Sequence, residues 1–316
     1  MQKTKTCGYS TIESKYNILQ IMLLTVSKLS KQYGEHQAIS ELSFSIQKGE
    51  IVGFLGSNGA GKTTTMRILA GCIGASSGHC SLNGLDITQH PLEVKKEIGY
   101  LPEVPPLYPQ MKVYDYLHFA AELRDVADPS KAVQATLKRL GLWELQHRFI
   151  DQLSKGYRQR LGLAQALVHE PSLILLDEPT NGLDPSQRHE LRELLRSLAN
   201  NGHTIVLSTH ILSEIEELCS RVLIIKKGHL IAEHELLNTE EQRMLVEILR
   251  PSEEFEEEIR ALNYTIESIQ NNCYEIQCKD NNREDIARIA SKYGLRSFTP
   301  CKKLETIYLS AMSSEL

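Results

Sequence analysis

A glycine-rich segment after a short apolar run constrains the fold of this chain more than any other feature. Residues 56–64 read Gly-Ser-Asn-Gly-Ala-Gly-Lys-Thr-Thr, between the apolar run 51–55 and a helical pattern over 65–70. A strand, a glycine loop and a helix in this order predict a P-loop. Glycines let backbone N–H groups converge on a phosphate, and the positive end of the helix dipole favours the same anion. The predicted nucleotide contacts are Gly56, Ser57, Asn58, Gly59, Ala60, Gly61, Lys62, Thr63 and Thr64.

Two residues of this loop have distinct expected roles. Lys62 is expected to reach the β- and γ-phosphates, and the Thr63 hydroxyl is expected to ligate Mg²⁺. A glycine-rich turn that happens to spell the pattern is the alternative. The flanking strand and helix disfavour it.

A second apolar run ends in two carboxylates. Leu173-Ile-Leu-Leu is followed by Asp177 and Glu178, as in a buried parallel strand whose C-terminal edge lies in a site. Asp177 is then expected to hold Mg²⁺ opposite Thr63, and Glu178 to orient and deprotonate an attacking water. For this pair alone, a solvated acidic turn is the alternative.

The order of strand and helix patterns predicts the architecture. Short β-like runs from Leu23 to Leu55 predict a small antiparallel β subdomain. Helical periodicity from Val113 to Ala166 predicts a separate helical lobe. Elsewhere apolar strands alternate with helices, which predicts an α/β fold with a parallel sheet core. These strand patterns cover 98–103, where the strand runs into a loop, and 173–176, 204–210 and 222–225.

The segment from Leu153 to Arg160, Leu-Ser-Lys-Gly-Tyr-Arg-Gln-Arg, resembles the Leu-Ser-Gly-Gly-Gln signature of the ATP-binding cassette (ABC) ATPases. From about Leu23 to Gly228 the other motifs of that family follow in order. The resemblance implies a P-loop ABC ATPase that binds and hydrolyses ATP with Mg²⁺. In order, the motifs are Tyr33, the P-loop, the Q-loop around Glu103, the signature, Asp177-Glu178, the D-loop Leu183-Asp184 and the switch residue His210.

In this family two such domains are understood to pair head to tail around two ATP molecules. The resemblance implies that Ser154 and Gly156 contact the γ-phosphate bound to the other copy, and that Asp184 lies near the dimer seam. His210 would contact the γ-phosphate of its own subunit, and Tyr33 would stack on the base. From the residues alone, Tyr33 fits an edge strand equally well, and His210 fits a hydrogen-bonded histidine at a strand end.

Three positions depart from the family pattern. Lys155 stands where the signature usually has Gly, and Tyr157 where it has Gln. Glu103 replaces the Q-loop glutamine; a carboxylate is still a suitable Mg²⁺ ligand but adds negative charge beside phosphates. These departures resemble the exporter-type (ABC-2) ATPase subunits of gliding-motility, sodium-efflux and drug-export systems.

The composition of the chain disfavours several kinds of partner and site. The 316 residues are 41% apolar and 24% charged, with 35 Lys and Arg against 40 Asp and Glu, for a net charge of -5. This balance argues against binding mainly to nucleic acid. The seven cysteines form no Cys-x-x-Cys pair, which argues against a disulfide framework or a zinc site. No stretch reaches the roughly 20 apolar residues of a membrane span.

We therefore expect the ATP-hydrolysing subunit of an ABC-2-type exporter, a homodimer on the cytoplasmic face of the plasma membrane with permease subunits on separate chains. A soluble ABC ATPase acting on ribosomes or DNA is the alternative. It is disfavoured by the single P-loop, the lack of a heptad run and the negative charge.

Three regions are expected along the chain. Residues 1–21 are predicted to be a disordered extension, with Met22 as the natural start, and 22–230 to be the ABC ATPase domain. Residues 231–316 are predicted to form an accessory domain with the order β-α-β-β-α-β, which resembles a ferredoxin-like fold. Its acidic run, 253–258, is expected to be a solvated helix face, with a partner contact as the alternative.

Overall fold

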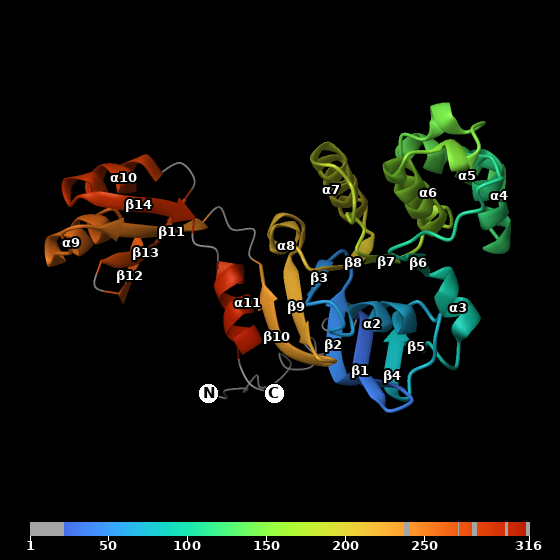
Figure 1. Cartoon of the computed structure of the whole chain (residues 1–316), viewed down its shortest axis with the longest axis horizontal. Helices are drawn as coiled ribbons and strands as arrows, with labels where there is room; N and C mark the ends of the chain where they lie inside the picture. The colour runs from blue at the N-terminus through green and yellow to red at the C-terminus, as the bar shows by residue number, and fades with distance from the viewer. Residues whose placement is uncertain (1–21, 237–240, 271, 280–282, 301–302, 314–316) are drawn as a thin grey trace, which may run out of the picture. The chain divides into compact units, whose positions relative to one another are not determined.

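The computed structural model describes residues 22–236, 241–270, 272–279, 283–300 and 303–313, so the predicted extension at 1–21 lies outside the described residues. The chain divides into two compact units, 1–236 and 237–316, whose elements are labelled in Figure 1. Each unit has its own buried core.

A six-stranded sheet forms the centre of the first unit. Its order is β10-β9-β3-β8-β7-β6, and all neighbours are parallel except β10, which pairs antiparallel with β9. The parallel core confirms the predicted fold. The β10 pairing carries this unit to Leu236, beyond the boundary expected after residue 230. The strands are β3 (Ile51–Leu55), β6 (Ile98–Leu101), β7 (Leu173–Asp177), β8 (Thr204–Thr209), β9 (Arg221–Lys226) and β10 (His229–Glu235).

An antiparallel sheet packs beside this central sheet. Its order is β2-β1-β4-β5, and β1 and β2 form a hairpin in which Tyr33 lies opposite His36. Phe44 of β2 meets Phe54 of β3 edge to face, with ring centroids 5.3 Å apart, so both sheets contribute to one core. The strands are β1 (Met22–Tyr33), β2 (His36–Gln47), β4 (Ser77–Leu82) and β5 (Leu85–Asp86).

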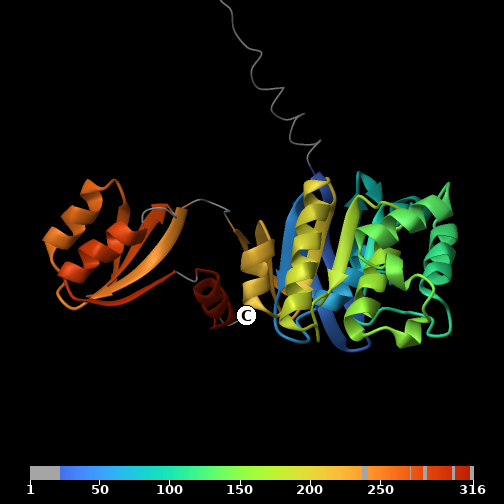
Figure 2. The same ribbon diagram turned by 90° about the horizontal axis from the view of Figure 1, so that it is seen from above.

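Helices cover both faces of the central sheet. In Figure 1, α2 lies on the face toward β1 and β4, whereas α7 and α8 lie on the opposite face; Figure 2 views the unit from the α7 and α8 side. Every residue of β3, β7 and β8 is buried, as expected for parallel strands covered on both sides. The helices are α2 (Lys62–Leu69), α3 (Pro91–Lys96), α7 (Pro185–Asn200) and α8 (Leu212–Leu218).

The predicted helical lobe gathers beyond the β6 edge of the sheet (Figure 1). Asp128 caps α5 by accepting a hydrogen bond from Lys131 N, and Ser154 caps α6 in the same way from Tyr157 N. The lobe contains the helices α4 (Val113–Leu123), α5 (Pro129–Arg139) and α6 (Lys155–Leu167), and the short 3₁₀ turns η1 (Trp143–Leu145) and η2 (Ile150–Gln152) lie between α5 and α6.

The second unit has the element order β-α-β-β-α-β followed by a last helix. Its antiparallel sheet has the order β12-β13-β11-β14. The ring of Phe255 in α9 meets those of Tyr274 and Tyr293 with centroids 5.0 and 5.4 Å apart. The elements are β11 (Glu241–Ile248), α9 (Glu253–Ala261), β12 (Thr265–Gln270), β13 (Cys273–Lys279), α10 (Arg283–Lys292), β14 (Leu295–Pro300) and α11 (Lys303–Ser313).

The acidic run lies on α9, which buries Phe255 and Ile259. Glu258 is not simply solvated, because it accepts hydrogen bonds from Lys292 Nζ at 2.7 Å and Tyr293 Oη at 2.9 Å. These bonds lower the pKa of the Glu258 carboxyl. This part of the run therefore joins α9 to α10.

His169, between α6 and β7, makes the stability of the first unit sensitive to acid. Its Nε2 donates to Ile98 O at 3.1 Å, and burial lowers its pKa from 6.5 to about 4, helped by the charge of Arg124 and opposed by that hydrogen bond. Because the unfolded chain takes up this proton near pH 6.5 and the folded chain near pH 4, the free energy of unfolding falls as the pH drops through that window. The expected loss is up to about 3 kcal/mol.

Urea unfolding at several pH values tests this expectation. The His169→Gln variant has no imidazole to titrate and should lose less stability between pH 6.5 and 4 than the unmodified chain. Equal losses in both proteins would show that His169 is not the responsible group.

Candidate nucleotide site

The P-loop wraps the N-terminus of α2. Gly61 is the N-cap of this helix and has φ 107°, in the region that favours glycine. A Cβ at this position would also lie 2.7 Å from Ala38 O. No side chain caps the helix, so its first N–H groups are available to an anion in front of the loop.

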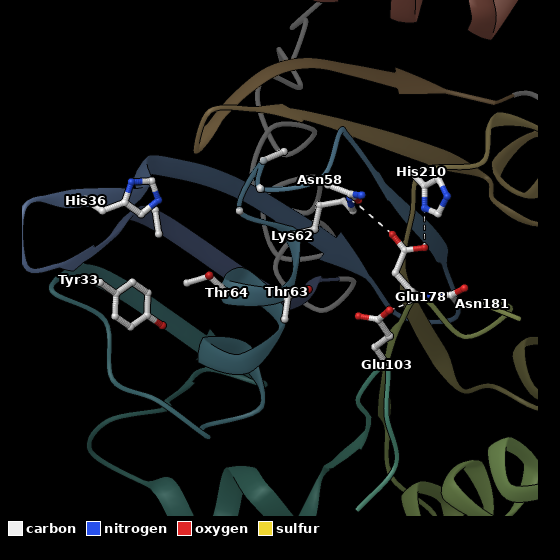
Figure 3. Close-up of a pocket in the computed structure, with 14 residues that line it drawn as sticks. Tyr33, His36, Asn58, Lys62, Thr63, Thr64, Glu103, Glu178, Asn181 and His210 are labelled. Carbon is white, nitrogen blue, oxygen red and sulfur yellow. Dashed lines mark hydrogen bonds and ion pairs between the residues drawn. The ribbon is translucent and has the colours of Figure 1, made fainter. Parts of the chain in front are cut away.

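Lys62 lies folded across the loop. Its buried Nζ donates to Gly56 O at 2.7 Å and to Ser57 O at 3.2 Å, and lies 3.6 Å from Glu178 Oε1 (Figure 3). Three acceptors thus surround an ammonium group that has three protons. A bound phosphate would compete with them for this cation.

Asp177 and Thr63, the two side chains predicted to hold Mg²⁺, are in direct contact. Thr63 Oγ1 donates to Asp177 Oδ1 at 3.1 Å, and Ser208 Oγ donates to the same oxygen at 2.6 Å. Asp177 and Ser208 are partners in the register of β7 and β8, which explains the second bond. All of these groups can coordinate a metal ion through oxygen, the type of ligand that Mg²⁺ prefers.

Glu178 follows β7 in a left-handed conformation, with φ 47°. Its N–H donates to both Ser208 O and Ser208 Oγ at 3.1 Å, which fixes the residue against the next strand. Its carboxylate faces the cavity, where Oε2 lies 2.9 Å from Nδ1 of the half-exposed His210 (Figure 3). Such backbone strain costs on the order of 1–3 kcal/mol and often marks functional positions.

A cavity of about 390 Å³ opens in front of the P-loop (Figure 3). Tyr33 lines it and is 47% exposed, so its ring is accessible to a base. Glu103 reaches the same cavity, where its Oε1 accepts a hydrogen bond from Asn181 Nδ2 at 2.8 Å. The cavity is lined by Tyr33, His36, Ala38, Asn58, Gly59, Ala60, Gly61, Lys62, Thr63, Thr64, Glu103, Glu178, Asn181 and His210.

The signature residues do not line this cavity. Ser154 caps α6, and Gly156 lies beside Asp184, the N-cap of α7, at a separate cavity of about 250 Å³. Gly156 packs so closely on Gln187 that a Cβ would lie 2.7 Å from its side-chain oxygen. Within one chain, the predicted contacts therefore fall into two separate groups.

Sequence reasoning missed three polar residues of the site, His36, Asn181 and Ser208, and the apolar Ala38. His36 could have been found from the hairpin register, since it lies opposite Tyr33. Ser208 ends a strand two residues before His210, and Asn181 lies between the carboxylates and Asp184. The sequence positions of Ser208 and Asn181, close to predicted site residues, could therefore have indicated them, whereas their residue types alone could not.

The comparisons with known proteins agree with this geometry. Residues 39–181 match the family model described as ABC transporter. The ABC transporter ATP-binding protein YdbJ of Bacillus subtilis strain 168 is 36% identical over 265 residues, which are 82% of this chain and 81% of YdbJ. The chain belongs to the ABC transporter ATP-binding proteins. Its first unit is an ABC ATPase domain.

Two further relatives are informative for this ABC ATPase. The bacitracin transport ATP-binding protein BcrA of Bacillus licheniformis is 40% identical over 212 residues, 67% of this chain and 69% of BcrA. The solved structure of cbiO1 from Clostridium perfringens, part of the ABC transporter complex cbiONQ, aligns with a TM-score of 0.62 and 29% identity. That alignment covers 68% of this chain and 89% of cbiO1. Among the described residues, no helix combines the length and the apolar character needed to span a membrane.

Proposed function

We propose that this ABC ATPase is the Mg-ATP-hydrolysing subunit of an ABC-2-type exporter, and that it works as a head-to-tail homodimer. The observation that supports a dimer is that the predicted nucleotide contacts of one chain fall into two separate groups. Neither Ser154 nor Gly156 lines the P-loop cavity; Ser154 is the N-cap of α6, and Gly156 lies at the other cavity beside Asp184. A second copy of the chain would bring its own signature residues to this P-loop cavity and so complete the nucleotide site.

Closure of the dimer would bring the N-terminus of α6 to the γ-phosphate of the other copy. Ser154 Oγ and the backbone N–H groups near Gly156 are hydrogen-bond donors at that helix end. Because the bound nucleotide lies between the two copies, ATP binding favours the closed dimer, and loss of the γ-phosphate reopens it.

The residues at the P-loop fit a magnesium ion. Thr63 and Asp177 offer neighbouring oxygen ligands, and Glu103 offers another carboxylate at the cavity wall. No group of three or more His, Cys, Asp or Glu side chains forms a ready metal site among the described residues. This suits an ion that takes its other ligands from phosphates and water, as Mg²⁺ does in nucleotide sites. Bound there, the ion would neutralise charge on the phosphates.

Proton transfer from the attacking water is assigned to Glu178. Its carboxylate lies at the cavity wall between Lys62 and His210, so it can accept a proton from a water in front of the γ-phosphate. When phosphate takes over Lys62, Glu178 loses that ion-pair partner and becomes available to the water. His210 then holds the carboxylate from the other side and can contact the γ-phosphate.

Tyr33 is assigned to the nucleobase. Stacking of a base on an aromatic ring contributes about 1–3 kcal/mol, so Tyr33→Ala should raise the KM for ATP roughly 10-fold or more. Inorganic tripolyphosphate has no base, and its affinity should not change. Tyr33→Phe keeps the ring and serves as the control. An equal loss of affinity for ATP and tripolyphosphate would contradict the stacking role.

An apolar groove next to the Q-loop is the proposed contact with separate membrane-spanning subunits. It encloses about 600 Å³ and is lined by Val104, Pro105, Leu107, Pro109 and Ile150 among others. Val104 is 79% exposed, so the groove presents an apolar side chain that a partner can reach. Through this groove the chain would sit at the cytoplasmic face of the membrane.

Export is proposed from the departures in the signature and the Q-loop, which resemble the ABC-2 subunits, and from similarity to the bacitracin transport protein BcrA. The second unit, which lies outside the residues matched by the family model, is proposed to serve dimerisation or regulation.

Site-specific crosslinking tests the membrane partnership. A photoreactive phenylalanine analogue at Val104, in the full chain, should crosslink to a multi-span membrane protein in native membranes. The same analogue at Leu92 of α3, which is 73% exposed, is the matched control and should not. Crosslinks only to ribosomal or DNA-bound proteins, or none from Val104, would overturn the exporter proposal.

A further inference from the structure

Two departures from the family pattern meet in space. Glu103, in place of glutamine, and Lys155, in place of glycine, both contact the short segment formed by Asn181 and Gly182. Glu103 bonds the Asn181 side chain, and Lys155 lies against Gly182. Residues far apart in the sequence thus converge just before the D-loop.

Glu103 and Asn181 form part of the wall between two hollows. Both residues line the nucleotide cavity, and both also line the apolar groove. The 2.8 Å bond from Asn181 Nδ2 to Glu103 Oε1 therefore joins two side chains that border both hollows; Figure 3 shows the two residues from the side of the nucleotide cavity. A shift of either side chain would change the lining of both the nucleotide cavity and the apolar groove.

Lys155 is directed toward this boundary rather than toward the signature cavity. It lines the groove together with Glu103 and Asn181, and is not among the residues around Gly156 at the signature cavity. Its ammonium occupies the space that a Cβ at Gly182 would need. Gly182 also has φ 72°, so glycine satisfies both the conformation and the close approach.

The chemistry of the Asn181 contact distinguishes glutamate from glutamine at position 103. A carboxylate that accepts from Asn181 through Oε1 retains a second oxygen, Oε2, for a cation. A glutamine side chain has one oxygen only. If Asn181 donates to that oxygen as it does to Glu103, the amide NH₂ group faces the cation, and NH₂ is not a magnesium ligand. The glutamine oxygen would face the cation only if the Asn181 amide turned over and accepted from this NH₂ through Oδ1.

We propose that Asn181 is a positioning residue that fixes the Glu103 carboxylate so that its second oxygen ligates the magnesium ion of the bound nucleotide. Lys155 supports this arrangement by packing on Gly182 and restricting the backbone next to Asn181. The inference rests on the proposed function, because it requires a magnesium nucleotide at the P-loop. It adds that ligation of Mg²⁺ by Glu103 depends on Asn181.

A double-mutant cycle in the full chain tests the dependence. The readout is the Mg²⁺ concentration that half-saturates binding of a trinitrophenyl-labelled ATP analogue, followed by fluorescence. Glu103→Gln should raise this concentration about 10-fold, the range expected when a ligand position is lost. In the Asn181→Ala background the same change should raise it about threefold or less, because the glutamine oxygen is then free to face the ion.

Lys155 has a matched control. Lys155→Gly should raise the half-saturating Mg²⁺ concentration in the unmodified background and leave it unchanged in the Asn181→Ala background. Lys48→Gly removes the same charge from an exposed turn and should have no effect in either. Asn181 is itself exposed, so its replacement leaves the core intact, and the thermal midpoint of each variant checks this.

The outcomes separate this inference from the function on which it rests. An effect of Glu103→Gln that is equal in both backgrounds, or no effect at all, overturns the positioning role while metal-dependent nucleotide binding stands. If the unmodified chain binds the analogue equally with and without Mg²⁺, or does not bind it, the proposed magnesium-nucleotide site fails and this inference fails with it.

Discussion

Replacement of Glu178 by Gln is expected to lower kcat for ATP hydrolysis by about 10²- to 10⁴-fold, the contribution of a general base. The amide keeps the size of the side chain and a hydrogen-bond acceptor for His210, but it cannot take a proton from water. Nucleotide binding should persist, because Lys62 and the P-loop are unchanged. Single-turnover hydrolysis and binding of the labelled ATP analogue measure the two effects separately.

Glu144→Gln is a suitable control for this variant, since it removes the same charge from an exposed position of the helical lobe. A Glu178→Gln protein that hydrolyses ATP at the unmodified rate would show that another group accepts the proton. A variant that no longer binds nucleotide would point instead to a structural role for the ion pair with Lys62.

Replacement of Lys62 by Ala is expected to have the second large effect. Lys62 is the buried cation beside the P-loop carbonyls, and its ammonium is the group that phosphate would capture. Loss of one such electrostatic contact typically lowers the rate about 10²- to 10³-fold, and here binding should weaken as well because the contact is made before the reaction. The measurements are kcat/KM for ATP and the Kd of the labelled analogue.

This variant also leaves Glu178 without one of its two side-chain partners, Lys62 and His210. Since an unpaired buried carboxylate is destabilising, the thermal midpoint of Lys62→Ala must be compared with that of the unmodified chain. Lys48→Ala, in the exposed turn, should change neither property. Unaltered nucleotide affinity in a folded Lys62→Ala protein would contradict the assigned phosphate contact.

Local sequence patterns predict much of this fold because each buried strand keeps its own signature. Ile51–Leu55 and Leu173–Asp177 are continuous apolar runs, and both are fully buried strands in the structure. The glycine loop between β3 and α2 follows from residue type alone. Asp177 and Thr63 were predicted to hold Mg²⁺ from opposite sides, and a hydrogen bond of 3.1 Å shows that the two side chains are neighbours.

Contacts that depend on the order of strands could not be predicted in the same way. Ser208 binds Asp177 because β8 lies beside β7, and neither run of residues indicates that pairing. A search for continuous buried apolar runs also misses the antiparallel β10, because every one of its residues is only partly buried or exposed. The Asn181 contact to Glu103 joins two loops, where periodicity carries no information.

The most direct test of the central claim is the mass of the Glu178→Gln protein in solution, measured by light scattering with and without Mg-ATP. Slow hydrolysis should preserve the nucleotide, and a composite site shared by two chains requires them to associate around it. We predict the mass of one chain without nucleotide and of two chains with Mg-ATP. A protein that has bound ATP but keeps the mass of one chain would contradict the shared site.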